Sequence, residues 1–147
     1  MSGLISVSAA PRRPKACSLA HVPLIAIVDD DLALRQALAE LCEVFDFGSE
    51  VFDCAESFFA AHATGRFDCV ITDLNMPGLS GIGLVQHLAA IDAKLPVIVM
   101  SAQTDPEIGA RVLRSGALAF LSKPIDDQVL HRHLIAAFSR GARGHAV

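Results

Sequence analysis

The chain has 147 residues, of which 52% are hydrophobic and 19% charged, and its net charge is −4 at pH 7. This composition excludes an intrinsically disordered protein, and 10 Gly, 7 Pro and 4 Cys exclude a collagen-like chain or a disulfide scaffold. The apolar runs are shorter than the roughly 18 residues that a membrane-spanning helix needs, so we expect one compact globular domain that makes no contact with a membrane.

Short apolar runs typical of buried strands alternate with segments of helical period along most of the chain. Residues 1–22 lack such a pattern and are rich in Ser, Ala, Pro and Arg, which predicts a disordered basic leader before a domain that begins near Pro23. The predicted strands are 24–28, 50–52, 69–72, 96–100 and 117–122, and the predicted helices are 32–46, 55–63, 82–90, 106–115 and 127–138. Residues 139–147 are expected to form a short flexible tail.

The regular alternation of strand and helix predicts an α/β fold, a (βα)5 doubly wound five-stranded parallel sheet with right-handed crossovers, over residues 23–138. Local signals support the helix boundaries. Asp105 followed by Pro106 is typical of a helix start, and Gly116 is typical of a helix end.

Polar residues gather where the predicted strands end, which is where ligands bind in such a sheet. They are Asp29, Asp30, Asp31, Thr72, Asp73, Asn75, Ser101 and Lys123. Carboxylates crowded at one edge repel each other and need a cation, and hard oxygen ligands favour Mg²⁺. A carboxylate flanked by Mg²⁺, a hydroxyl and an ammonium is suited to accept a phosphoryl group, and Asp73 is the central candidate. No glycine-rich phosphate loop is present, so we expect no nucleotide.

Four separated motifs carry a resemblance to a known family: IVDDD at 27–31, ITDLNMPGLSG at 71–81, VMSA at 99–102 and FLSKP at 120–124. In this order and at these intervals they resemble the receiver domain of bacterial two-component response regulators. The resemblance implies a flavodoxin-like receiver fold. It also implies that Asp73 takes a phosphoryl group from a sensor histidine kinase or a histidine phosphotransfer protein.

The resemblance further assigns the other motif residues. The metal ligands that it implies for Mg²⁺ are Asp29, Asp30, Asp73 and Asn75, the last through its backbone carbonyl. Ser101 would hydrogen-bond one phosphoryl oxygen, and Lys123 would pair with another, with a cis bond between Lys123 and Pro124. Gln103 and Asn75 stand where the family tunes self-dephosphorylation.

Phe120 occupies the family's aromatic switch position, which is often filled by Tyr, and lacks the hydroxyl group. Our hypothesis is that phosphorylation draws Ser101 toward the phosphoryl group and that Phe120 fills the vacated space, remodelling the face made by residues 105–138. The same face could form a homodimer. Arg111 or Arg114 could form charge pairs with the acids at 126–127 across such a dimer. The alternative, to which we give equal weight, is that these charges are simply solvated.

These features favour a response regulator that signals through contact with a downstream protein. It would not be an enzyme beyond self-dephosphorylation. Three alternatives stay open: a receiver fragment of a DNA-binding transcription regulator, a pseudo-receiver that acts as a docking module, and a small Mg²⁺-dependent phosphatase. The phosphatase is disfavoured because Asn75 stands where such enzymes typically carry a second acid. Taken alone, the acids at 29–31 could simply begin a helix.

The distribution of charge indicates whether the chain binds nucleic acid, and the cysteines indicate the cellular compartment. Residues 24–138 hold 7 basic against 16 acidic side chains, and the short basic arms are too sparse for a DNA footprint, so we expect no direct nucleic-acid binding. Cys17, Cys42, Cys54 and Cys69 include no C-x-x-C pair and predict free thiols. With no convincing signal peptide, we expect a cytoplasmic location.

Overall fold

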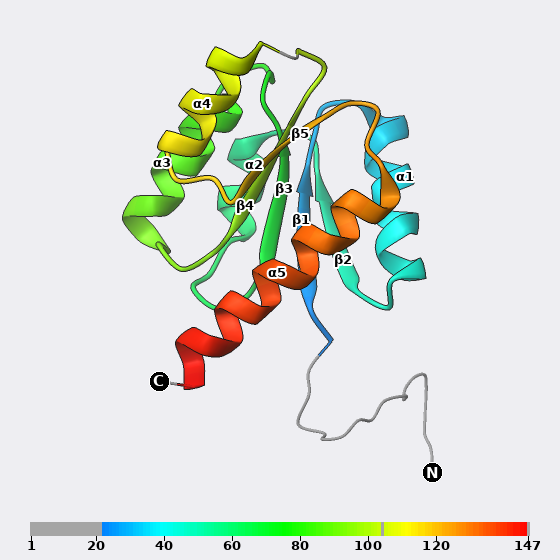
Figure 1. The fold of residues 1–147 in the computed structure, drawn as a ribbon, viewed down its shortest axis with the longest axis vertical. Helices are drawn as coiled ribbons and strands as arrows, with labels where there is room; N and C mark the ends of the chain where they lie inside the picture. The colour runs from blue at the N-terminus through cyan, green and yellow to red at the C-terminus, as the bar shows by residue number, and fades with distance from the viewer. Residues whose placement is uncertain (1–21, 104, 147) are drawn as a thin grey trace.

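The computed structural model describes residues 22–103 and 105–146, in which five strands alternate with five helices (Figure 1). The strands are β1 (Leu24–Val28), β2 (Gly48–Phe52), β3 (Cys69–Asp73), β4 (Val97–Ser101) and β5 (Ala119–Ser122). The helices are α1 (Leu32–Val44), α2 (Ala55–Ala61), α3 (Gly81–Ile91), α4 (Pro106–Arg114) and α5 (Asp127–Ala146). The predicted (βα)5 order is confirmed.

All strand pairs are parallel, and the sheet order is β2-β1-β3-β4-β5. Helices α1 and α5 cover one face of the sheet, and α2, α3 and α4 cover the other (Figure 1). Both faces are therefore buried, which is why the strands are apolar at successive positions instead of alternating.

The side chains of each strand divide between two cores. Ala26 and Val28 of β1 pack with Phe58 of α2, whereas Ile25 and Ile27 of the same strand pack with α1 and α5. The alternation follows from the two-residue period of a strand. It fixes which side chains at the strand ends point toward each layer of helices.

Capping residues begin the helices close to the predicted positions. Asp31 is the N-cap of α1 and accepts hydrogen bonds from the backbone N–H of Ala33 and Leu34. Asp105 caps α4, with Pro106 at its first position, and Gly116 follows that helix with φ +114°. The helix-start interpretation is thus correct for Asp31, the last of the three consecutive acids.

The largest difference from the sequence-based boundaries concerns α5. It was expected to end at Phe138, but it continues to Ala146, so the tail predicted for 139–147 is helical over its described part. The apolar stripe does end near Phe138, but no Pro follows Asp127, so no residue of this segment removes a helical hydrogen-bond donor. Smaller differences occur in the sheet, where β2 begins earlier, at Gly48, and β5 begins later, at Ala119.

Three cysteines lie in the described residues, and all three are free thiols. Cys42 and Cys69 are buried between the sheet and its α1–α5 layer, and burial raises the pKa of the Cys42 thiol to about 11. Cys17 and the predicted leader, apart from Val22, lie outside the described residues. In the part of the chain that the structure describes, no helix has both the length and the apolar character required to cross a membrane.

Candidate functional site

The residues singled out at the strand ends meet at one edge of the sheet. Strand β1 ends just before Asp29, Asp73 is the last residue of β3, and Ser101 is the last residue of β4. The parallel register pairs Val28 with Thr72 and Asp73 with Met100, so that these ends lie level with each other. The expected convergence therefore follows from topology alone.

Three carboxylates form the centre of this edge. Ligand oxygens of Asp29, Asp30 and Asp73 all lie within 4.8 Å of one another. Asp29 is 0% exposed and Asp73 7% exposed, whereas Asp30 faces solvent. Two of the three acids are thus removed from water, where like charges are costly to hold together.

Lys123 brings one positive charge into the acidic cluster. Its Nζ lies 2.8 Å from Asp73 Oδ1 and 3.3 Å from Asp29 Oδ2, and its side chain is 24% exposed. The backbone N–H of Lys123 donates to the carbonyl of Ser101 at 2.8 Å, and the Lys123–Pro124 peptide is cis, as predicted. The ammonium therefore bridges two acids at the ends of neighbouring strands, Asp29 just after β1 and Asp73 at the end of β3.

The surroundings shift the pKa values of Asp29 and Lys123. Burial raises the pKa of Asp29, and the Asp73 charge adds to the rise, while the backbone N–H of Asp31 and the Lys123 ammonium oppose it. Burial acts to lower the pKa of Lys123, but the hydrogen bond and charge of Asp73, together with the Asp29 charge, outweigh burial and raise it. Lys123 therefore stays an ammonium at neutral pH.

The donor set fits a small divalent cation. Three carboxylates face one ammonium, which leaves a surplus of negative charge, and the donors are all hard oxygens. Asn75, whose backbone carbonyl is the fourth predicted ligand, lies two residues beyond Asp73 at an exposed position of the β3–α3 loop. Thiol and imidazole ligands, which would favour Zn²⁺, do not enter the metal-binding group found among the described residues.

Glycine 81 keeps the start of α3 close to the acids. A Cβ atom at this position would lie 2.6 Å from the carbonyl oxygen of Asp73 and 2.9 Å from Cα of Leu74. The N–H of Gly81 donates to the carbonyl of Leu74 at 2.8 Å. Only glycine allows this approach, which holds the β3–α3 loop against the end of β3.

Ser101 and Phe120 lie on the same side of the sheet. Ser101 is 1% exposed and follows Val99 by two residues, so both belong to the face covered by α2, α3 and α4. Phe120 packs with that same core, and a Cβ built at Gly109 on α4 would lie 3.1 Å from its ring. Ser101 Oγ accepts a hydrogen bond from the N–H of Gln103 at 2.9 Å. This placement is compatible with the predicted switch.

Sequence reasoning missed two charged residues beside the site. Arg35 of α1 donates from Nη1 to the carbonyl of Asp29 at 2.7 Å, and Glu56 of α2 accepts from the N–H of Leu79 at 3.2 Å. Arg35 is half-buried and Glu56 is exposed, and a single charged residue at such a helix position is ordinary. No spacing rule marks either contact, because each forms with a loop whose path only the fold determines.

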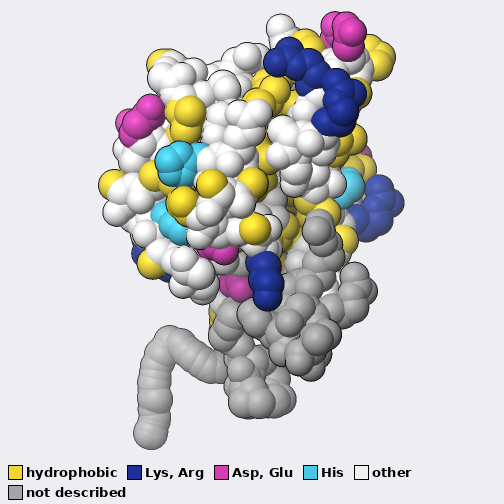
Figure 2. Space-filling view, turned by 90° about the vertical axis from the view of Figure 1, so that its left-hand side faces the viewer, with side chains coloured by type: hydrophobic (Ala, Val, Ile, Leu, Met, Phe, Trp, Pro, Cys, Tyr) yellow, Lys and Arg dark blue, Asp and Glu magenta, His cyan; other side chains and the backbone are white. Residues whose placement is uncertain are grey.

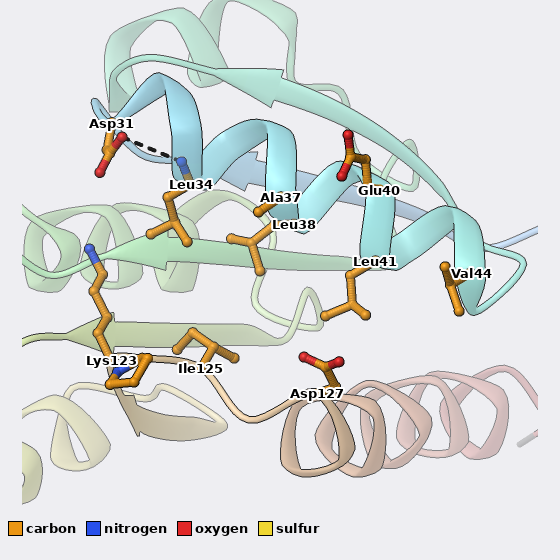
Figure 3. A pocket seen from close by; sticks show the side chains of 11 residues that line it. Asp31, Leu34, Ala37, Leu38, Glu40, Leu41, Val44, Lys123, Ile125 and Asp127 are labelled. Carbon is orange, nitrogen blue, oxygen red and sulfur yellow. Dashed lines mark hydrogen bonds between the residues drawn. The ribbon is translucent and has the colours of Figure 1, made fainter.

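A groove begins beside the site and runs between α1 and the β5–α5 connection (Figure 3). Its volume is about 610 Å³. Leu34, Leu38 and Leu41 of α1 line one wall, and Lys123 and Ile125 line the other. The groove therefore offers an apolar surface next to the Lys123 ammonium.

Comparison with known proteins gives the family. The model of the response regulator receiver domain matches residues 25–135, and the chain belongs to that family. The transcriptional regulatory protein FixJ of Bradyrhizobium diazoefficiens is 36% identical over 106 residues, which are 72% of this chain and 52% of that protein. The transcriptional regulatory protein TdiR of Thauera aromatica is 32% identical over 116 residues, 79% of this chain and 51% of that protein.

Solved structures agree with the fold. The response regulator receiver protein from Pseudomonas putida is 33% identical with a TM-score of 0.72, and the match covers 80% of this chain and 98% of that one. Response regulator StyR is 32% identical with a TM-score of 0.78, covering 86% of this chain and 64% of the other. The chain spans about half the length of the curated regulators named above. The predicted family and flavodoxin-like receiver fold are confirmed.

Proposed function

We propose that this chain is a phosphorylation-dependent switch in which Asp73 accepts a phosphoryl group from a phosphorylated histidine. The observation that carries the proposal is the Lys123 ammonium, which contacts both Asp29 and Asp73 within a cluster of three carboxylates. A surface acidic patch would not bury two of its acids around one lysine. The arrangement suits a site that receives additional negative charge together with a cation.

The transfer follows from the geometry around Asp73. One carboxylate oxygen of Asp73 attacks phosphorus, a P–O bond forms as the P–N bond of phosphohistidine breaks, and the imidazole leaves with the electron pair and takes up a proton. Bound Mg²⁺ would offset the negative charge of the phosphoryl oxygens. Lys123 would move from Asp73 Oδ1 to a phosphoryl oxygen, and Ser101 would donate its hydroxyl proton to another.

Four residues are the proposed ligands of Mg²⁺. Asp29, Asp30 and Asp73 would bind it through their carboxylates, and Asn75 would bind it through its backbone carbonyl. Asn75 also supports a switch over a phosphatase, because a phosphatase typically carries at this position an acid that moves a proton. We therefore propose no catalysis on external substrates, and turnover is limited to hydrolysis of the chain's own aspartyl phosphate.

The groove beside α1 is the proposed docking site for the donor, a sensor histidine kinase or a histidine phosphotransfer protein. Its leucines offer apolar contacts, and it opens next to Lys123, so a partner helix lying there could present its phosphohistidine to Asp73 (Figure 3). We place the reaction in the cytoplasm, where free thiols such as Cys54 persist.

The output surface that we propose is the face made by residues 105–138. Figure 2 shows a small group of Lys and Arg side chains at its upper right, and α4 carries two exposed arginines, Arg111 and Arg114. This face would bind a downstream protein or a second copy of the chain once Phe120 moves. Because FixJ and TdiR are transcriptional regulators about twice as long as the matched region, a receiver portion of such a regulator is the second candidate.

Intact mass spectrometry tests the phosphoacceptor. Incubation with acetyl phosphate and Mg²⁺ should add about 80 Da, the mass of one phosphoryl group. The adduct should be absent from Asp73→Ala and from wild type treated with EDTA. An adduct that survives in Asp73→Ala would place the acceptor elsewhere. No adduct in the wild type, with no response to beryllofluoride, would favour the docking-module alternative.

A further inference from the structure

A carboxylate outside the predicted site contacts the loop that carries Asn75. The loop leaves Asp73 at the end of β3 and reaches Ser80, the N-cap of α3. Its first residue is well anchored, because Leu74 is buried and its N–H donates to the carbonyl of Met100 at 2.8 Å. Beyond the buried Met76 the loop is largely exposed, so other contacts must determine its path.

Glu56 makes one such contact. Its Oε2 accepts a hydrogen bond from the N–H of Leu79 at 3.2 Å. The same carboxylate leaves no room for a side chain at Gly78, since a Cβ built there would lie 2.9 Å from Oε2. Gly78 has φ +82°, a conformation that side chains disfavour. Within the described residues, the Leu79 bond is the one hydrogen bond that joins the backbone of residues 75–79 to another helix or strand.

The position of Glu56 is fixed from the other side. It lies in the first turn of α2, where the helix dipole favours a carboxylate, and its neighbours Ala55 and Phe58 are fully buried in the core. The carboxylate is therefore attached to a rigid element, and its hydrogen bond adds to the packing of the partly buried Leu79 side chain against the same core. Contact with the carboxylate limits how far residues 77–79 can move away from α2.

We propose that Glu56 is a positioning residue, which holds the β3–α3 loop so that the backbone carbonyl of Asn75 faces the acids Asp29, Asp30 and Asp73. This inference rests on the proposed function, since it gives the loop its role as a metal-binding segment. Glu56 acts through the hydrogen bond to Leu79 and does not touch the cation. Its contribution is a smaller loss of loop freedom when Mg²⁺ binds.

Two substitutions separate the hydrogen bond from the charge. Glu56→Ala removes the acceptor, whereas Glu56→Gln keeps an acceptor oxygen without the charge. Glu107→Ala is the matched control, because Glu107 is also an exposed acid in the first turn of its helix, α4. The chain has no Trp or Tyr, so Mg²⁺ affinity is measured by titration calorimetry instead of fluorescence.

We expect Glu56→Ala to weaken Mg²⁺ binding about fivefold, the scale of one solvent-exposed hydrogen bond. The Mg²⁺ affinities of Glu56→Gln and Glu107→Ala should stay within about twofold of that of the wild type, because neither substitution removes the acceptor of the Leu79 hydrogen bond. Without metal, the Leu79 amide should exchange hydrogen faster in Glu56→Ala only. With acetyl phosphate, Glu56→Ala should need more Mg²⁺ for half-maximal phosphorylation but reach the wild-type rate at saturation.

The outcomes are decisive. Equal Mg²⁺ affinity in Glu56→Ala and a phosphorylatable wild type would overturn the positioning role and leave the proposed function standing. A loss in Glu56→Gln equal to that in Glu56→Ala would also overturn it, because the effect would then come from charge. No phosphorylation of any variant, with no Mg²⁺ binding by wild type, would overturn the function and the inference together.

Discussion

Removing the charge of Asp30 should stabilise the metal-free protein. Asp30 faces solvent, and its carboxylate lies within 4.8 Å of those of Asp29 and Asp73. In Asp30→Asn this repulsion disappears, while the contacts of Lys123 with the two buried acids remain. The substitution thus removes the repulsion between Asp30 and the two buried carboxylates and keeps the ion pairs of Lys123 with Asp29 and Asp73.

The size of the effect follows from Coulomb's law. Like charges that lie within 4.8 Å of each other repel by at least about 0.9 kcal/mol in water and about 3.5 kcal/mol at an effective dielectric of 20. Because Asp30 is exposed and Lys123 offsets part of the repulsion, we expect a net gain near 1 kcal/mol. Loss of a favourable charge just before α1 subtracts a few tenths of a kcal/mol. A melting temperature about 3–5 °C higher corresponds to that gain.

Calorimetric melting with and without Mg²⁺ is the assay. Wild type should gain about 2.7 kcal/mol at a hundredfold excess of Mg²⁺ over its dissociation constant, while Asp30→Asn should respond only at higher Mg²⁺, so that the order of stabilities reverses. Glu43→Gln removes one charge near the far end of α1 and should not change the response. The reasoning is refuted if Asp30→Asn melts below wild type without metal or responds to Mg²⁺ as wild type does.

Three other perturbations test the packing and the ion pairs. Lys123→Ala leaves Asp29 and Asp73 without a counter-charge and should lower the free energy of unfolding by about 1–3 kcal/mol in urea, since the lysine is partly solvated; no change would contradict the pairing. Phe58→Ala should cost about 3–5 kcal/mol in the same assay, because it empties a buried aromatic position, and a smaller loss would mean that the core collapses around it. Burial raises the pKa of Cys42 to about 11 from its ordinary 9.0, so the unfolded thiol ionises first and this thiol alone should lower stability by about 2 kcal/mol as pH rises from 9 to 11. Burial also raises the pKa of Cys69, which adds a loss of its own; Cys42→Ala should therefore reduce the fall by about 2 kcal/mol without abolishing it, and an unchanged profile would contradict the reasoning.

Much of the fold was predictable because the sequence repeats one local pattern. Apolar runs at 24–28, 69–72 and 96–100 can be buried on both faces only if helices cover both sides, and the segments between them have helical period. The polar residues that end those runs must then share one edge of a parallel sheet. Asp29, Asp73 and Ser101 were found in this way; the structure brings Asp29 and Asp73 together and buries Ser101 at the end of the neighbouring strand β4.

The end of α5 shows where local pattern stops being informative. The apolar stripe that marks a packed helix ends near Phe138, but the backbone hydrogen bonds of a helix do not require an apolar neighbour. A segment without Pro can continue as helix beyond the part that packs. Sequence periodicity reports burial, and so it predicted an end at Phe138 for a helix that continues to Ala146.

The sequence by itself therefore determined the order of elements, the two-sided burial of the sheet and the identity of the residues at its carboxyl edge. The tertiary structure decided the strand order, the bridging of Asp29 and Asp73 by Lys123, and the contacts of Arg35 and Glu56 with neighbouring loops. The physical reason is separation along the sequence. Hydrophobic period and capping act between residues a few positions apart, whereas Glu56 and Leu79 are 23 positions apart and Asp29 and Lys123 are 94 apart. These pairs therefore meet only when the whole sheet has formed.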